Sequence, residues 1–175
     1  MLSSNRRAFL TQIAALPVLG LLAGCGFTPV FGADGVARTL RGRIAYRAPN
    51  TPEGFRLRTR LEDRLGRVER GDYLLTVQLE IEEDAIAISS TQDINRFNLP
   101  GKATWTLTEP GNDTPLASGI AQTFTAYSAF GTTVATREAQ DNARDRLAVA
   151  LADLIVTDII IASAGVAANN PSQDR

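Results

Sequence analysis

Apolar and polar residues alternate along four stretches of the chain, and each alternation predicts a β-strand. In residues 73–82, odd-numbered apolar positions alternate with even-numbered polar ones, as in a strand with one buried and one solvated face. The other strands are expected at residues 39–47, 97–108 and 116–127. In the last of these, Leu116, Ile120 and Phe124 form the more apolar side.

The alternation changes parity after residue 82. Ile86 and Ile88 are even-numbered, whereas the apolar residues before them are odd-numbered. A shift of one residue reverses the two faces of a strand, so we expect a bulge or bend at Glu83 and Asp84. Residues 89–96 are polar and predict a turn, and Pro100-Gly101 predicts a break near the start of the third strand.

Two segments carry helical periodicity. Thr51 is a candidate N-cap before Pro52, and the first helix is expected to end near Leu65, before Gly66. The second begins near Thr133 and carries one apolar stripe, in which we expect Leu147, Leu151 and Leu154 to contribute most to stability. The stripe comprises Ala139, Ala143, Leu147, Ala150, Leu151, Leu154 and Ile155.

The order of these elements is β-α-β-β-β-α. It predicts an α+β fold in which both helices, each with one apolar face, pack on one face of a four-stranded mixed sheet. The first two strands form a crossover unit and should be parallel. The other face, which carries Thr76, Gln78, Thr104 and Thr106, is expected to lie open to water or to a partner.

Residues 1–25 have the pattern of a bacterial lipoprotein signal. Arg6 and Arg7 precede an uncharged segment, residues 8–20, and Leu22-Ala23-Gly24-Cys25 resembles a lipobox. The segment is short of the ~20 apolar residues that a membrane span needs. We therefore predict that Cys25 receives a lipid and that residues 1–24 are removed.

The adjacent arginines leave two export routes open. Asn5-Arg6-Arg7-Ala8-Phe9-Leu10 resembles a twin-arginine signal, and it also fits an ordinary secretory signal with two neighbouring arginines. Beyond the signal, we expect a lipidated tether at residues 25–38, one domain at 39–163 and a disordered tail at 164–175.

Composition narrows the possible chemistry. The chain has no histidine and one cysteine, and loss of residues 1–24 changes its net charge from −1 to −3. Histidine-dependent catalysis and most zinc sites are thereby excluded, and bulk nucleic-acid binding is not indicated. Glu82-Glu83-Asp84 alternate between faces, so we interpret them as a solvated bulge. We predict neither an enzyme nor a cofactor, and we place Trp105 and Phe124 in the core.

The chain resembles the lipopolysaccharide-assembly lipoprotein LptE family of alphaproteobacteria. The residues that carry the resemblance are the lipobox with the following Gly26-Phe27-Thr28-Pro29-Val30-Phe31, the order of elements, and the helical run from Arg137 to Leu147. The resemblance implies an outer-membrane lipoprotein that plugs the β-barrel translocon LptD and assists lipopolysaccharide assembly. Gly26 rather than Asp after the cysteine is compatible with release to the outer membrane.

Five basic residues are candidates for contact with lipopolysaccharide phosphates, because guanidinium and ammonium groups bind phosphate oxygens. They are Arg56, Arg60, Arg64, Arg96 and Lys102. The alternative is that they belong to solvated surfaces. Two other functions also stay open: an auxiliary lipoprotein of a phospholipid or small-molecule transport system, and a lipid-anchored enzyme.

Overall fold

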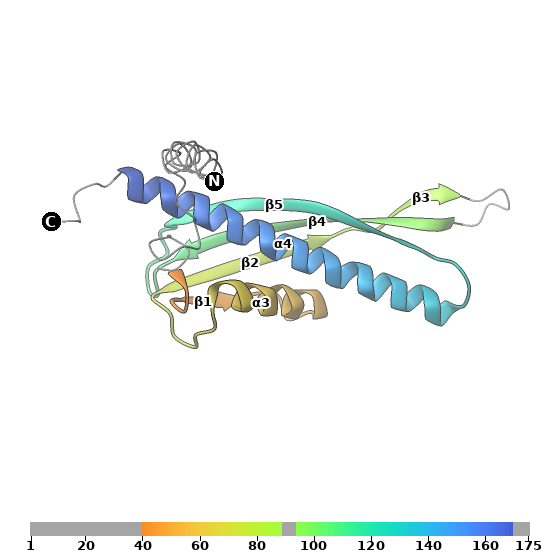
Figure 1. The fold of residues 1–175 in the computed structure, drawn as a ribbon, viewed down its shortest axis with the longest axis horizontal. Coiled ribbons are helices and arrows are strands. Elements are labelled where there is room, and N and C mark those ends of the chain that lie inside the picture. The colour runs from red at the N-terminus through yellow and green to blue at the C-terminus, as the bar shows by residue number, and fades with distance from the viewer. Residues whose placement is uncertain (1–39, 89–93, 170–175) are drawn as a thin grey trace, which may run out of the picture. The chain divides into compact units, whose positions relative to one another are not determined.

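A computed structural model of the chain describes residues 40–88 and 94–169. The chain divides into the compact units Met1–Gly35 and Val36–Arg175, and the described residues all belong to the second. The elements in order are β1 (Ile44–Arg47), α3 (Pro52–Leu65), β2 (Tyr73–Ile81), β3 (Asp84–Ile88), β4 (Ile94–Thr108), β5 (Ala117–Ser128) and α4 (Thr133–Asn169) (Figure 1). The predicted signal peptide, Cys25 and the predicted tether lie outside the described residues.

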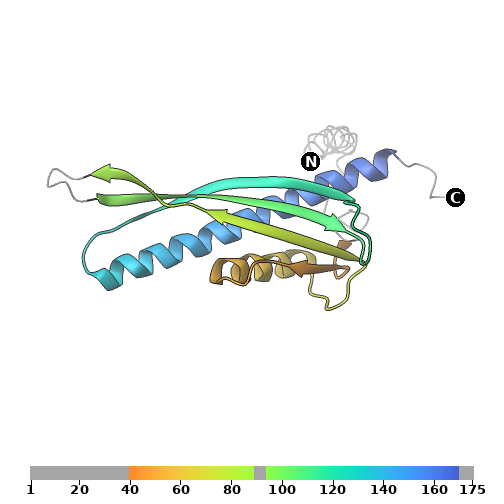
Figure 2. The same ribbon diagram turned by 180° about the vertical axis from the view of Figure 1, so that it is seen from behind.

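The strands form one mixed sheet, and both helices lie on one face of it, which Figure 2 shows from the strand side. β1 is parallel to β2, whereas β2 and β4, and β4 and β5, are antiparallel. The predicted α+β class, the two helices on one face and the parallel crossover are therefore confirmed. The sheet has five strands rather than four, because the strand conformation is interrupted at Glu82 and Glu83. The chain then continues as β3, which pairs with the start of β4.

Helix α3 forms as its sequence predicts. The Thr51 side chain accepts a hydrogen bond from the Gly54 backbone N–H at 3.1 Å, and Pro52 opens the first turn. Gly66 has a φ of 88°, a value that glycine adopts without strain, and it ends the helix. Leu57, Leu61 and Leu65 are fully buried on the face that packs against α4 and the sheet.

The core lies between the helices and the odd-numbered residues of β2, β4 and β5, together with Ile44 of β1. Its largest fully buried side chains include Trp105, Leu75 and Leu99 from the sheet and Leu147, Leu151, Ile155 and Ile159 from α4. Leu154 is 38% exposed, so its predicted role in the core is wrong. Ala148 and Ala152 are buried instead, which places the contact face of α4 to one side of the predicted stripe.

Several boundaries differ from the predicted ones. The first strand starts at Ile44 rather than at residue 39, because Gly42 forms a turn whose N–H donates to the Leu65 carbonyl at 2.7 Å. β4 starts at Ile94, inside the predicted turn, and continues through Pro100-Gly101 without the predicted break. α4 continues to Asn169, so the predicted start of a tail at residue 164 falls inside this helix.

Candidate interaction surface

The sheet face opposite the helices is the candidate functional surface, and we call it the open face. It consists of the even-numbered residues of β2, β4 and β5, which lie side by side in register: Thr76 pairs with Thr106, and Gln78 with Thr104. Gln78 is exposed and the three threonines are partly exposed. The predicted open, polar face is thus present over β2 and β4, and none of the described helices packs on it.

On β5 the open face carries two exposed, large apolar side chains among polar ones, which the sequence interpretation missed. Ile120 is 56% exposed and Phe124 is 68% exposed, so the predicted core position of Phe124 is wrong. The register explains the difference. Trp105 points into the core and lies directly opposite Gly119, so the odd-numbered residues of β5 also face the core. Ile120 and Phe124 must then point outward.

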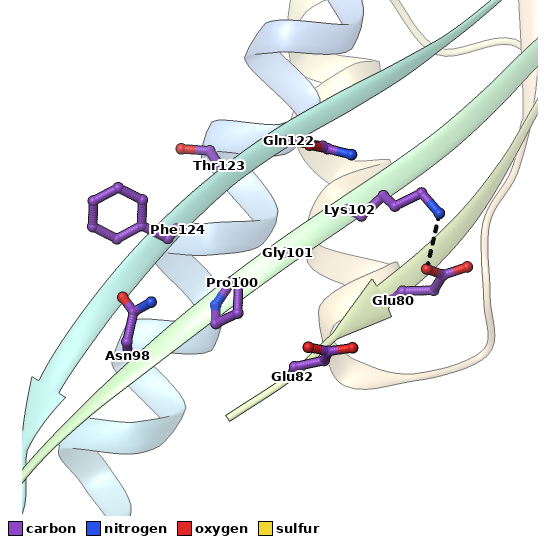
Figure 3. Close-up of a pocket in the computed structure, with 9 residues that line it drawn as sticks. All are labelled: Glu80, Glu82, Asn98, Pro100, Gly101, Lys102, Gln122, Thr123 and Phe124. Carbon is purple, nitrogen blue, oxygen red and sulfur yellow. Dashed lines mark hydrogen bonds and ion pairs between the residues drawn. The ribbon is translucent and has the colours of Figure 1, made fainter. Parts of the chain in front are cut away.

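A shallow hollow of about 470 Å³ lies on the open face beside Phe124 (Figure 3). Phe124 and Pro100 are cross-strand partners and form its apolar side. On the other side, the Lys102 ammonium group lies 3.2 Å from the Glu80 carboxylate. The hollow therefore combines an apolar wall with one exposed ion pair.

The structure separates the five basic candidates into two groups. Arg60 and Arg64 face Asp153 at 3.0 Å and 3.6 Å, and Arg56 faces Asp145 at 3.8 Å, so these three arginines join α3 to α4. Lys102 and Arg96 lie on the open face. They are six residues apart on one strand, a separation of about 20 Å, so they cannot grip a single phosphate.

The acidic segment between β2 and β3 holds a network that sequence reasoning missed. Glu83 accepts hydrogen bonds from the Tyr127 hydroxyl at 2.8 Å, the Gln140 amide at 2.7 Å and Arg144 at 3.2 Å. Its side chain is only 28% exposed, so the Glu83 carboxylate is bound by protein groups, contrary to the predicted solvated bulge. No sequence signal indicates contacts between residues this far apart.

The network shifts the pKa values of Glu83 and Tyr127. Burial by itself raises the pKa of Glu83, but the hydrogen bonds from Gln140, Tyr127 and Arg144 outweigh it and hold this pKa below its usual value. Burial, together with the hydrogen bond to Glu83, raises the pKa of Tyr127 to about 12. Glu83 is therefore a carboxylate at neutral pH, and Tyr127 is its neutral donor.

Within residues 40–88 and 94–169, no three acidic or cysteine side chains come close enough to hold a metal ion. Among the helices that the structure describes, none is both long enough and apolar enough to cross a membrane.

Solved lipoproteins share this fold. A lipoprotein from Caulobacter crescentus is 23% identical, with a TM-score of 0.63 over 74% of this chain and 96% of that one. Rare lipoprotein B from Shewanella oneidensis is 12% identical, with a TM-score of 0.56 over 70% and 97% of the two chains. A minor lipoprotein from Acinetobacter baumannii is 16% identical, with a TM-score of 0.55 over 71% and 92%. At these identities the likeness establishes the fold.

The sequence comparisons identify the family. No curated protein matches the chain. The family described as LptE, lipopolysaccharide-assembly, matches residues 40–159, which covers every strand and most of α4. The chain therefore belongs to the LptE lipopolysaccharide-assembly family.

Proposed function

We propose that the mature protein is held in the outer membrane by acyl chains on Cys25, assembles with the β-barrel translocon LptD and plugs its lumen during lipopolysaccharide assembly. The observation that supports this most is the open face, a sheet surface without a covering helix among the described residues. Its threonine and glutamine side chains suit the polar interior of a large barrel. The protein acts here as a structural partner, and no catalytic role is proposed.

The exposed cations of the open face are the proposed contacts for lipopolysaccharide phosphates. Arg96 is exposed, and Lys102 has only a surface partner, Glu80, so a phosphate can approach either of them. A phosphate that bound Arg60 would have to displace Asp153, which already receives two hydrogen bonds from this guanidinium group. We therefore assign Arg56, Arg60 and Arg64 to the joint between the helices.

A charged residue on the open face should disrupt binding to LptD, which is measured by copurification. Gln78→Lys and Thr106→Lys should leave the melting temperature of the soluble domain nearly unchanged, because exposed substitutions usually alter stability by less than about 0.5 kcal/mol. In the lipidated protein, the same changes should reduce the amount of LptD that copurifies, because an unpaired charge in a buried contact is costly.

Thr157→Lys on α4 is the matched control, because Thr157 is exposed on the helix side of the domain. The proposal would be contradicted if both open-face variants copurified with as much LptD as the wild type while Thr157→Lys lost it. The interface would then lie on the helices. Recovery of an inner-membrane transporter with the wild-type protein, and of no barrel, would favour an auxiliary role in phospholipid or small-molecule transport.

A further inference from the structure

The break at Glu82 and Glu83 interrupts the sheet along one edge of β4, whereas β5 pairs with the other edge of β4 without interruption from Arg96 to Leu107. β4 pairs with β2 from Gly101 onward, and it pairs with β3 up to Asn98. We call β3 and residues 94–98 of β4 the arm, which extends beyond the N-terminal end of α3 (Figure 1). At the break, one backbone hydrogen bond remains, from the Glu82 N–H to the Pro100 carbonyl at 3.0 Å. An interrupted ladder is a place where a sheet can bend.

Glu83 lies at this bend, and its two carboxylate oxygens bind different elements. Oε1 accepts the Tyr127 hydroxyl of β5 at 2.8 Å. Oε2 accepts the Gln140 amide at 2.7 Å and an Arg144 N–H at 3.2 Å, both from α4. The residue at the bend is thus tied at the same time to the neighbouring strand and to the long helix.

Arg144 connects the bend to the other helix. Its Nη1 lies 3.2 Å from Glu53 in the first turn of α3, and its Nη2 lies 3.2 Å from Glu83. The side chains of Arg144, Glu53 and Glu83 are 34%, 15% and 28% exposed, so water screens this triad less than the open surface pairs. A single guanidinium group therefore joins the two helices and the bend.

Tyr127 extends the network to the arm itself. Its ring stacks on Phe97 with 5.1 Å between the ring centroids, and Phe97 pairs with Ala85 of β3 within the arm. Tyr127 is 7% exposed, so the ring is packed while its hydroxyl reaches Glu83. Phe97 and Tyr127 are register partners in the β4–β5 ladder, so rotation of the arm about the bend would have to bend β5 together with β4. It would also disturb the hydrogen bonds that Glu83 accepts from Gln140 and Arg144.

We propose that Glu83 and Arg144 are positioning residues that fix the angle at which the arm leaves the sheet. The break allows bending, and the contacts of Glu83 with α4 and β5 select one direction. The consequence for assembly rests on the proposed function: the arm angle determines which surface the arm presents to the barrel.

The test measures this angle by the distance between two spin labels. Cys25 is the only cysteine, so Cys25→Ser in the full mature chain gives a background without thiols. One label is placed by Ile86→Cys on the arm and the other by Val134→Cys at the start of α4, both at exposed positions. A reference pair, Glu69→Cys and Asn112→Cys, lies away from the arm at two exposed sites.

In the parent protein we expect one narrow distance distribution for the arm pair. Arg144→Met and Glu83→Gln should broaden or shift it, leave the reference pair unchanged, and still give one cooperative melting transition, if at a lower temperature. Arg58→Met is the matched control, because it removes the ion pair of Arg58 with Glu62 within α3 and should leave both distributions narrow. Arg144→Lys, which keeps the charge, should restore part of the parent distribution.

An unchanged arm distribution in folded Arg144→Met and Glu83→Gln would overturn the proposal. Unfolding of both variants would also overturn it, because a positioning role leaves the core intact. These measurements need no barrel, so they stand even if the wild-type protein recovers no LptD and the proposed function fails. If the barrel is recovered, lipidated Arg144→Met should retain less of it, and equal recovery would refute the link between arm angle and assembly.

Discussion

Arg60 and Asp153, which are 93 residues apart in the sequence, form a bidentate ion pair. Arg60 donates from Nε to Oδ1 and from Nη2 to Oδ2, each at 3.0 Å, and this contact joins α3 to α4. The two carboxylate oxygens match the two parallel N–H groups of the guanidinium. The side chains are 35% and 37% exposed, which limits the strength of the pair.

A double-mutant cycle should give this pair a small but measurable coupling. Arg60→Met and Asp153→Asn should each lower the free energy of unfolding by about 1 kcal/mol or less, and the double variant should lose less than the sum. Urea denaturation followed by circular dichroism measures the three losses. Strict additivity would show that the ion pair does not hold the helices together.

Leu151 should be far more important for stability than its neighbour Leu154. Leu151 is fully buried, whereas Leu154 is 38% exposed. Leu151→Ala should cost about 2–5 kcal/mol, because it removes buried methyl groups and leaves a cavity. Leu154→Ala is the matched control with the same chemical change, and equal losses in thermal melting would contradict the observed contact face of α4.

Gly119 should not accept even a methyl group. A Cβ at this position would lie 2.8 Å from Cζ2 and 2.9 Å from Nε1 of the Trp105 indole, which is buried and rigid. Gly119→Ala should therefore destabilise the domain by about 1–3 kcal/mol through overpacking. At Gly101 the added group would lie 2.9–3.0 Å from Cγ and both Cδ atoms of Leu147, an aliphatic side chain that is less rigid than an indole ring, so Gly101→Ala should cost less. The comparison of the two melting temperatures is the test.

Acid should weaken the domain through Glu83 and Glu53. Burial raises the pKa of Glu53, but hydrogen bonds from its own backbone, Arg144 and Thr51 outweigh this effect, and the pKa of Glu83 is lowered as well. Both pKa values are lower in the folded state. The two carboxylates therefore contribute fully to the free energy of unfolding above the pKa of an unfolded glutamate, about 4.3, and this contribution is lost as the pH falls through their pKa values in the folded state.

Glu83→Gln tests whether folding lowers the pKa of Glu83. The difference in melting temperature between wild type and variant should be constant from pH 7 to about pH 5 and should shrink below about pH 4, where the wild-type carboxylate takes up a proton. Glu82→Gln removes a charge from the exposed neighbour and is the control. A difference that grows with falling pH would show that the pKa of Glu83 is raised rather than lowered.

Cys25→Ser tests the predicted anchor. The variant should be found in the soluble fraction or stay unprocessed, since each buried CH₂ of an acyl chain contributes about 0.8 kcal/mol to membrane binding. Cell fractionation and intact mass measure both outcomes, in cells that lack the proposed partner LptD. Wild-type mass and full membrane retention of the Ser variant would exclude lipidation at Cys25.

The local patterns were sufficient to predict most of the elements. The N-cap at Thr51, the stop at Gly66 and the alternation in β2 are each determined by neighbouring residues, and the structure has all three. The parity change at Glu83 likewise predicted the bend. These features depend on backbone geometry over a few residues, which a single sequence contains.

The orientation of β5 depends on a residue in another strand. Alternation shows that Phe124 and Thr123 lie on opposite faces, but it does not show which face is buried. Trp105 decides this, because its large ring fills the space above Gly119, its partner in the register. The odd-numbered residues of β5, from the small Ala117 and Gly119 to Tyr127, therefore face the core, and Ile120 and Phe124 are left outside.

The same limit applied to the candidate site. The sequence placed Arg60 on a helix, but Asp153 and Glu83 acquire their partners only when distant segments fold together. Charge patterns along the chain could not distinguish a phosphate-binding arginine from one that joins two helices. The open threonine face was predictable, because the two predicted helices can cover only one of the two faces of the sheet.

Trp105 is the only tryptophan of the chain, and it is 2% exposed. Its indole N–H has no hydrogen-bond partner among the described residues, so the ring lies in an apolar environment. Its fluorescence should be emitted at short wavelength in the native protein and shift to the red when water enters the core. The protein thus carries an intrinsic optical probe at the centre of its sheet, which can follow folding without any added dye.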